Sequence, residues 1–161
     1  MICITGTPGA GKSTLMEEMR KRGYDVHEFD ELVANCIESY EDGEAIIDEK
    51  CIRRIRKRGM YFGHLSHYAR CDMVIVLRAH LKDIAKRLAD RGYDRKKVVE
   101  NVECEAIDLI GEESLSIHPE KTYELMNDDV GRTADVIERI IKGEISPGEK
   151  IDLMGEILDW Y

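Results

Sequence analysis

Short apolar runs alternate along this chain with longer amphipathic stretches. Five of the runs end at glycine or at a turn and are typical of strands, at residues 2–5, 24–29, 60–65, 73–77 and 122–126. The run at 73–77 contains no polar residue, which indicates a strand buried on both faces of a parallel sheet. We therefore expect a sheet built from strands that are distant in sequence.

Apolar positions recur at helical spacing between these runs. The pattern predicts helices over residues 13–22, 31–40, 44–58, 81–91, 94–113, 134–141 and 151–160. Strands that alternate with helices predict an α/β doubly wound fold with a parallel sheet. No repeat and no linker interrupts residues 1–161, so we expect a single domain.

Composition narrows the class of protein. The 161 residues include 33 acidic and 24 basic side chains, a net charge of −9 that argues against a general binder of nucleic acid or of anionic membranes. There is no apolar run of about 18 residues and no recognisable signal peptide, so we expect a cytoplasmic protein with no membrane partner. The five cysteines form no CxxC pair, which predicts reduced thiols, without a zinc site or a disulfide framework.

Residues 6–13 fit the phosphate-loop pattern GxxxxGK[ST]. Glycines let successive backbone N–H groups face one anion, and the following helix adds its N-terminal dipole. Lys12 can reach the β- and γ-phosphates, the Ser13 hydroxyl can hold Mg²⁺, and the Thr14 N–H should face the α-phosphate. A glycine-rich turn without a ligand is the alternative, but the preceding strand and the following helix favour a nucleotide site.

Basic side chains cluster around the dipeptide Gly92-Tyr93. They are Arg87, Arg91, Arg95, Lys96 and Lys97. Two helices that meet at a glycine-containing hinge could form a lid whose guanidinium groups close over phosphoryl groups. The alternative is an ordinary solvated helix pair.

Three further side chains lie at the ends of predicted strands, where ligands bind in a parallel sheet. His64 is placed to approach a nucleotide, whereas His67 is expected as a polar loop residue. A metal pair formed by the two histidines lacks an obvious third ligand. Asp30 either faces the site or caps the next helix.

The sequence resembles a known family at these positions. Residues 5–14 (TGTPGAGKST) look like the phosphate loop of adenylate kinases. Residues 72–108 are similar to the corresponding stretch of the adenylate kinase isoenzyme 6 family, through the pattern RL-x-x-RGY-x-x-KK-x-x-x-N-x-x-CE that begins at Arg87. The resemblance extends over about residues 1–128. That family comprises archaeal and nuclear P-loop kinases linked to maturation of the small ribosomal subunit.

The resemblance implies a five-stranded parallel sheet with an NMP-binding segment at about 30–48 and a short lid at about 90–100. It assigns ATP binding to Gly9, Ala10, Gly11, Lys12, Ser13, Thr14, Arg91 and Arg132. Asp30 falls in the NMP-binding segment, and Ser13 would hold Mg²⁺. The expected catalytic set consists of Lys12, Arg91, Arg87 and His64.

The implied activity is ATP + AMP ⇌ 2 ADP, accompanied by some ATP hydrolysis. The implied partners are ATP, AMP, a ribosomal protein of the small-subunit platform and small-subunit rRNA. Other functions stay open: a nucleotide-switched ribosome assembly ATPase, a kinase or NTPase acting on another small molecule, and a module that binds ATP without turnover.

One position departs from the family pattern. Phe62 stands two positions before His64, where the family has an acidic residue. That carboxylate would orient water around Mg²⁺, so its loss should weaken hydrolysis more than transfer to AMP, whose phosphate is already anionic.

Overall fold

Five parallel strands form the central sheet of the computed structural model, which describes residues 1–161, in the order β2–β5–β1–β6–β7. Their bounds are β1 (Ile2–Gly6), β2 (Val26–Glu28), β5 (Met60–Phe62), β6 (Met73–Arg78) and β7 (Thr122–Met126). Central β1 pairs with β5 on one side and with β6 on the other. The α/β class and the five-stranded parallel sheet are confirmed.

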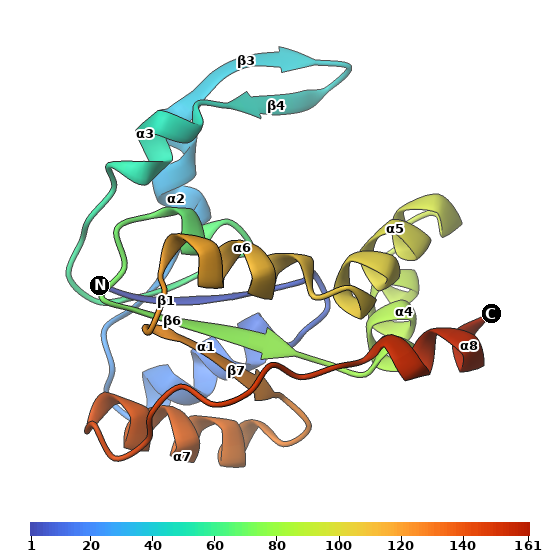
Figure 1. Ribbon diagram of the computed structural model, residues 1–161. Coiled ribbons are helices and arrows are strands. Elements are labelled where there is room, and N and C mark those ends of the chain that lie inside the picture. Colours follow the sequence, from blue (N-terminus) through green and yellow to red (C-terminus); the bar gives the residue numbers. More distant parts are fainter.

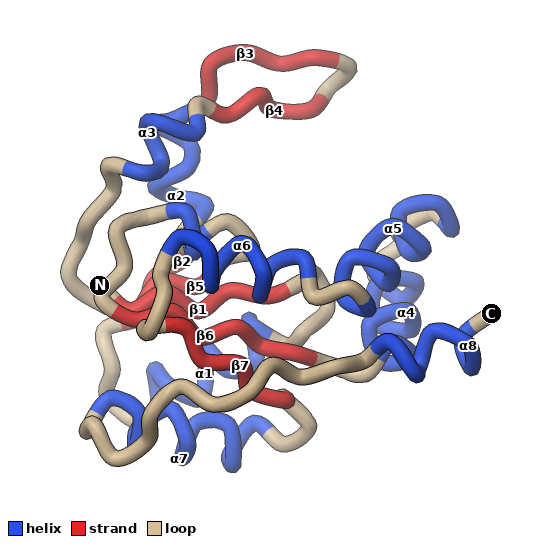
Figure 2. The backbone as a smooth tube through the Cα atoms, in the orientation of Figure 1, coloured by secondary structure: helices blue, strands red, loops and turns tan.

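Helices cover both faces of this sheet (Figures 1 and 2). Helices α1 (Lys12–Lys21) and α7 (Val130–Ile141) lie on one face, and α6 (Leu109–Ile117) lies on the other. Helices α4 (Leu81–Asp90) and α5 (Arg95–Ala106) stand beyond the carboxyl end of β6. The short η3 (Met154–Glu156) and α8 (Ile157–Trp160) pack beside α4 at the end of the chain. None of these helices is long and apolar enough to cross a bilayer.

Two of the predicted helices after β6 differ from the structure. The stretch 94–113 is broken because Asp108 has a left-handed backbone (φ 55°) and its side chain caps α6 by accepting from the Gly111 N–H. The stretch 151–160 begins without regular secondary structure, because both backbone groups of Ile151 bond to side chains of the sheet, namely Arg78 and Glu124. Local periodicity contains neither of these tertiary constraints.

Apolar side chains alternate between the two faces of the sheet. Ile75 and Leu77 of β6 pack with α1, α4 and α7, whereas Val74 and Val76 face the other side with Phe29. All four β6 side chains are at most 1% exposed. The unbroken apolar run therefore belongs to a strand that is buried on both faces, as predicted.

The segment between β2 and β5 contradicts the prediction of two long helices. It contains α2 (Asp30–Val33), η1 (Ala34–Cys36), the antiparallel hairpin β3 (Ile37–Glu41) and β4 (Glu44–Ile47), and α3 (Glu49–Arg53). The hairpin projects from the body of the molecule (Figure 1). Its turn consists of Asp42 (φ 49°) and Gly43 (φ 80°), and two positive φ values are what a type I′ turn requires.

Four cysteines correct the expectation of reduced thiols. Cys3 is bonded to Cys71 and Cys36 to Cys51, with Cα–Cα separations of 6.0 and 5.5 Å, and only Cys104 is free. The partners are 68 and 15 residues apart. A search for CxxC spacing misses pairs of this kind because the fold, rather than the local sequence, brings them together.

The two disulfides predict the thiol count. We expect one titratable thiol per denatured chain before reduction and five afterwards, measured with a chromogenic disulfide reagent. Because the loop of 15 residues alone should contribute about 3 kcal/mol, reduction should lower the free energy of unfolding by at least about that amount. Cys104→Ser is the control and should show no free thiol before reduction. Five reactive thiols in the unreduced wild type would contradict the pairing.

Candidate nucleotide-binding site

The phosphate loop connects the central strand to helix α1. Gly9 (φ 93°) and Gly11 (φ 94°) have the left-handed backbone that glycine adopts without strain. Asn127, at the end of β7, braces the loop because its Nδ2 donates to the Ala10 carbonyl at 2.9 Å. A Cβ at position 11 would collide with this amide. The loop conformation is therefore fixed by its own glycines and by the neighbouring strand.

Lys12 is folded back onto the loop. Its Nζ donates to the Gly6 carbonyl at 2.6 Å and to the Thr7 carbonyl at 3.1 Å. Burial lowers the pKa of Lys12 to about 8, and the nearby positive charge of Arg91 acts in the same direction. Phosphate oxygens would supply a negative charge that the two carbonyls lack. The ammonium group can therefore leave these carbonyls and bind an anion.

This lowered pKa predicts how nucleotide binding depends on pH. A bound phosphate favours the protonated amine, so binding takes up a proton where Lys12 is neutral in the free protein. The affinity for ADP should be constant from about pH 6.5 to 7.5 and should fall about tenfold per pH unit above about pH 8. Titration calorimetry tests this dependence. Lys12→Arg, which stays charged, should remove the alkaline fall, and a wild-type affinity that is constant to pH 9.5 would contradict the assignment.

A cavity of about 270 Å³ opens in front of the loop, at the carboxyl ends of β2, β5 and β1. It brings together side chains from four separate segments. Its lining includes Gly9, Gly11, Lys12, Ser13, Glu28, Asp30, Phe62, His64, Arg91 and Tyr93. Burial, together with the charge of Lys12, lowers the pKa of His64, so its imidazole is neutral at neutral pH. Acidic and basic groups thus face one another across a polar cavity.

Several predicted residues lie away from this cavity. The Arg87 guanidinium donates to the Gly9 carbonyl at 2.8 Å and so supports the loop. Arg95 lies over the ring of Trp160, 6.0 Å from its centroid. Arg132 is exposed at the start of α7 and lines a separate cavity of about 340 Å³. Thr14 is exposed on the first turn of α1. Their roles in nucleotide binding stay predictions.

Asp30 and His67 can now be placed. The residue at the N-cap of α2 is Phe29, so Asp30 is not the cap of that helix and instead lines the cavity. His67, expected as a polar loop residue, is 1% exposed, and its Nδ1 lies 3.0 Å from Thr5 Oγ1. Burial and two neighbouring histidines lower the pKa of His67 to about 4. It is therefore a neutral residue of the interior.

A second cavity of about 490 Å³ adjoins the first. The two share Pro8, His64 and Tyr93, and the second continues between η2 (Ser66–Tyr68) and α5 toward Asn101 and Glu113. The projecting hairpin reaches toward α5 on this side, where Glu44 lies 3.6 Å from Lys97. Two connected cavities beside one phosphate loop give room for two ligands.

Sequence reasoning missed three contributors to the site. Asn127 has no local signal, because it reaches the loop from 117 residues away. Tyr93 belongs to the RGY triplet, which could have pointed to it, since this side chain lines both cavities. Glu28 could have been found by its position at the end of a predicted strand.

Comparison with known proteins agrees with this geometry. The AAA domain family matches residues 2–108. A protein of Methanothermobacter thermautotrophicus is 40% identical over 174 residues, which is 98% of this chain and 99% of its own length. One from Archaeoglobus fulgidus is 37% identical over 165 residues, 99% of this chain and 91% of its own. Both are described as "Putative adenylate kinase".

Solved structures show the same fold at low identity. Deoxyadenosine kinase from M. mycoides has a TM-score of 0.53 at 16% identity, covering 88% of this chain and 98% of its own. TT1252 from Thermus thermophilus reaches 0.54 at 17% identity, covering 89% and 96%. Fold and loop together define a P-loop protein of the α/β class. The chain belongs to the AAA domain family. It also belongs to the family of the two archaeal relatives described above as putative adenylate kinases.

Proposed function

We propose that the protein is a nucleoside monophosphate kinase that transfers the γ-phosphoryl group of Mg-ATP to AMP and forms two ADP. The observation that carries the proposal is the pair of adjoining cavities that share His64, both lined by residues of the phosphate loop. A hydrolase needs room for one nucleotide and water, whereas a kinase needs room for two nucleotides in line. The full-length similarity to relatives named as adenylate kinases supports AMP as the acceptor.

The cavity contains oxygen ligands of the kind that Mg²⁺ prefers. The Ser13 hydroxyl stands at the start of α1, and the carboxylates of Glu28 and Asp30 line the opposite wall. Ser13 would hold the ion directly and the carboxylates would bind its water ligands. When bound, Mg²⁺ neutralises phosphate charge and orients the γ-phosphoryl group.

Positioning and charge neutralisation account for the chemistry. An oxygen of the AMP phosphate attacks the γ-phosphorus of ATP, and the bond to the β–γ bridging oxygen breaks with its electron pair leaving on ADP. Lys12 moves from the Gly6 and Thr7 carbonyls to the phosphates, and Arg91 balances charge from the lid side. The attacking phosphate is already ionised, so the neutral His64 need only orient it.

An ADP-formation assay tests the proposal. Mg-ATP is supplied with AMP, CMP, UMP, GMP or no acceptor. ADP well above the rate without acceptor, and with AMP alone, supports the proposal. A rate that is independent of every acceptor contradicts it and supports the alternative implied by the resemblance, an ATPase that acts as a switch in ribosome assembly with a platform protein and rRNA.

The proposal includes weak ATPase activity, because Phe62 occupies the position of a carboxylate that would orient the attacking water. This side chain is 4% exposed, packs in the core and lines the cavity where a carboxylate would orient water. Phe62→Asp should therefore raise Mg²⁺-dependent phosphate release without acceptor, on the order of tenfold. Phe62→Asn, which is polar but uncharged, should give no such gain. An unchanged rate in Phe62→Asp would remove this explanation.

A further inference from the structure

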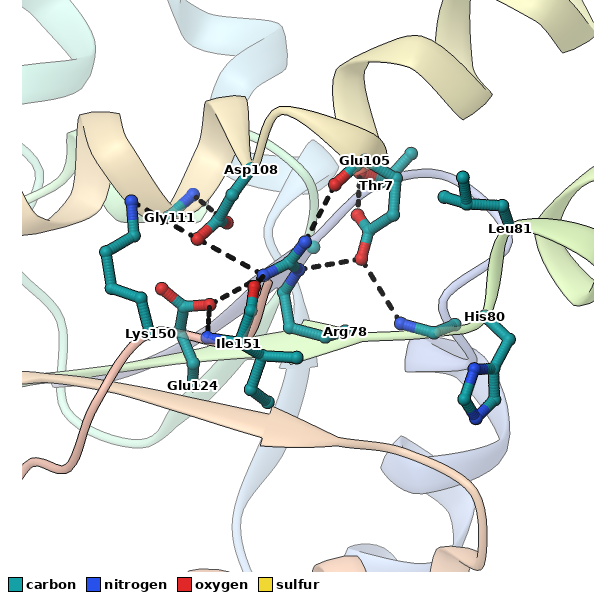
Figure 3. Close-up of polar contacts among 12 residues, drawn as sticks. Thr7, Arg78, His80, Leu81, Glu105, Asp108, Gly111, Glu124, Lys150 and Ile151 are labelled. Carbon is teal, nitrogen blue, oxygen red and sulfur yellow. Dashed lines mark hydrogen bonds and ion pairs between the residues drawn. The ribbon is translucent and has the colours of Figure 1, made fainter. Parts of the chain in front are cut away.

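A buried ion cluster lies behind the phosphate loop (Figure 3). Its centre is Arg78, the last residue of β6, which is 0% exposed. Its guanidinium donates to Glu105 Oε1 at 2.8 Å and to Glu124 Oε1 at 2.7 Å, and lies 3.2 Å from Asp108 Oδ2. Three carboxylates from α5, the α5–α6 junction and β7 thus converge on one cation.

Glu105 differs from the other two carboxylates because it also contacts the loop. Its Oε2 accepts a hydrogen bond from the Thr7 hydroxyl at 2.5 Å, and its Oε1 accepts from the Ala79 N–H at 3.2 Å. The side chain is 2% exposed, so water does not compete for these bonds. The hydrogen bonds of Glu124 go to Arg78, to the Ile151 N–H and to Asp108, and none of them reaches the phosphate loop.

The contacts continue to the reacting side of the loop. Thr7 is held through its hydroxyl by Glu105, and its carbonyl accepts from Lys12 Nζ at 3.1 Å. Glu105 is therefore linked to the amine of Lys12 through a single residue of the loop.

We propose that Glu105 is the positioning residue of the phosphate loop, which it fixes through the Thr7 hydroxyl so that the Thr7 carbonyl and Lys12 stay in place. The inference rests on the proposed kinase function and adds a residue of α5 that touches no substrate. Since α5 begins within the lid segment, the same carboxylate anchors the far end of the lid helix to the loop.

The test compares variants by the rate of ADP formation from Mg-ATP and AMP at neutral pH. Glu105→Gln should lower kcat/KM for ATP by about 10- to 100-fold, as expected when a catalytic group is displaced. Thr7→Val should reproduce much of this effect, because it breaks the same hydrogen bond from the other side. Thr7→Ser keeps the hydroxyl and should retain the wild-type rate.

Glu124→Gln is the matched control. It removes a buried carboxylate from the same Arg78 without touching the loop, so it should lower the melting temperature while leaving kcat/KM within about twofold of the wild type. The double variant Thr7→Val/Glu105→Gln should lose little more than Glu105→Gln alone, since both changes break one contact. If Glu105→Gln does not fold, the Thr7→Val and Thr7→Ser pair decides.

Two results would overturn the inference. Glu105→Gln could behave like Glu124→Gln, with a lower melting temperature and an unchanged kcat/KM, which would make it only a partner of Arg78. Thr7→Val could keep the wild-type kcat/KM. If the wild type forms no ADP, the proposed function fails separately, and the inference is then tested by calorimetric binding of Mg-ADP, whose affinity should fall in Glu105→Gln and Thr7→Val but not in Glu124→Gln.

Discussion

Lys12→Met is expected to lower kcat for ADP formation on the order of 10³-fold while the chain remains folded. Lys12 is the cation that stands at the phosphate loop, and its Nζ already lies within hydrogen-bond distance of two loop carbonyls. Methionine keeps the apolar stem and removes only the charge, so the loss falls on the transition state in which charge spreads over the γ-phosphoryl oxygens. Single-turnover kinetics with Mg-ATP and AMP measures the effect.

Lys86→Met is the matched control for this change. Lys86 is an exposed lysine of α4 whose ammonium pairs only with Asp90, at 3.1 Å. Its replacement should leave kcat within about twofold of the wild type, as expected of an exposed side chain outside the site. A Lys12→Met enzyme within tenfold of the wild-type rate would show that the phosphate-loop assignment is wrong.

Arg78→Met should destabilise the protein by about 3–5 kcal/mol, the usual loss when one partner of a buried ion pair is removed. Glu105 and Glu124 would lose their shared cation, and both side chains are at most 5% exposed. Burial already raises the pKa of Asp108 to about 7. Without Arg78 the cluster keeps buried negative charge with too little compensation. Urea unfolding at pH 8 measures the loss.

The pH dependence of the destabilisation distinguishes uncompensated buried charge from a packing defect. Buried carboxylates without a cation have raised pKa values, so acid neutralises them more readily in the folded state than in the unfolded state. The destabilisation should therefore be smaller at pH 5 than at pH 8. Arg139→Met, at an exposed arginine paired with Glu144 at 3.4 Å, should cost no more than about 0.5 kcal/mol. An equal loss at both pH values would contradict the electrostatic account.

The phosphate loop could be predicted because its signal is local. The glycines, Lys12 and Ser13 fall within eight residues, and the adjoining strand and helix have clear periodicity. Strand β6 could be predicted equally well, since burial on both faces leaves an unbroken apolar run. Where residues close together in sequence determine the chemistry and the fold, the sequence pattern is sufficient to predict them.

The hairpin β3–β4 has a local signal that competes with a helical one. Asp42-Gly43 is a strong hairpin signal, but the apolar positions on either side also fit a helical period. The strands are almost entirely exposed, so neither shows the clean alternation of a half-buried strand. The positive φ values of the turn, rather than the periodicity, determine the structure of this segment.

The ion cluster and the disulfides had no readable signal. Arg78 meets Glu105 and Glu124 across 27 and 46 residues, and Cys3 meets Cys71 across 68. An arginine at the end of an apolar strand could equally have faced solvent. Only the topology, which places the end of β6 beside α5 and β7, makes these residues partners.

The most direct test of the central claim is to supply Mg-ADP alone and follow it by phosphorus NMR. A kinase with two nucleotide sites in line should convert ADP into equal amounts of ATP and AMP, with no inorganic phosphate, until equilibrium is reached. The appearance of AMP with phosphate but no ATP would show hydrolysis instead of transfer. Unchanged ADP would show that the two cavities do not act together, and either result would contradict the proposed function.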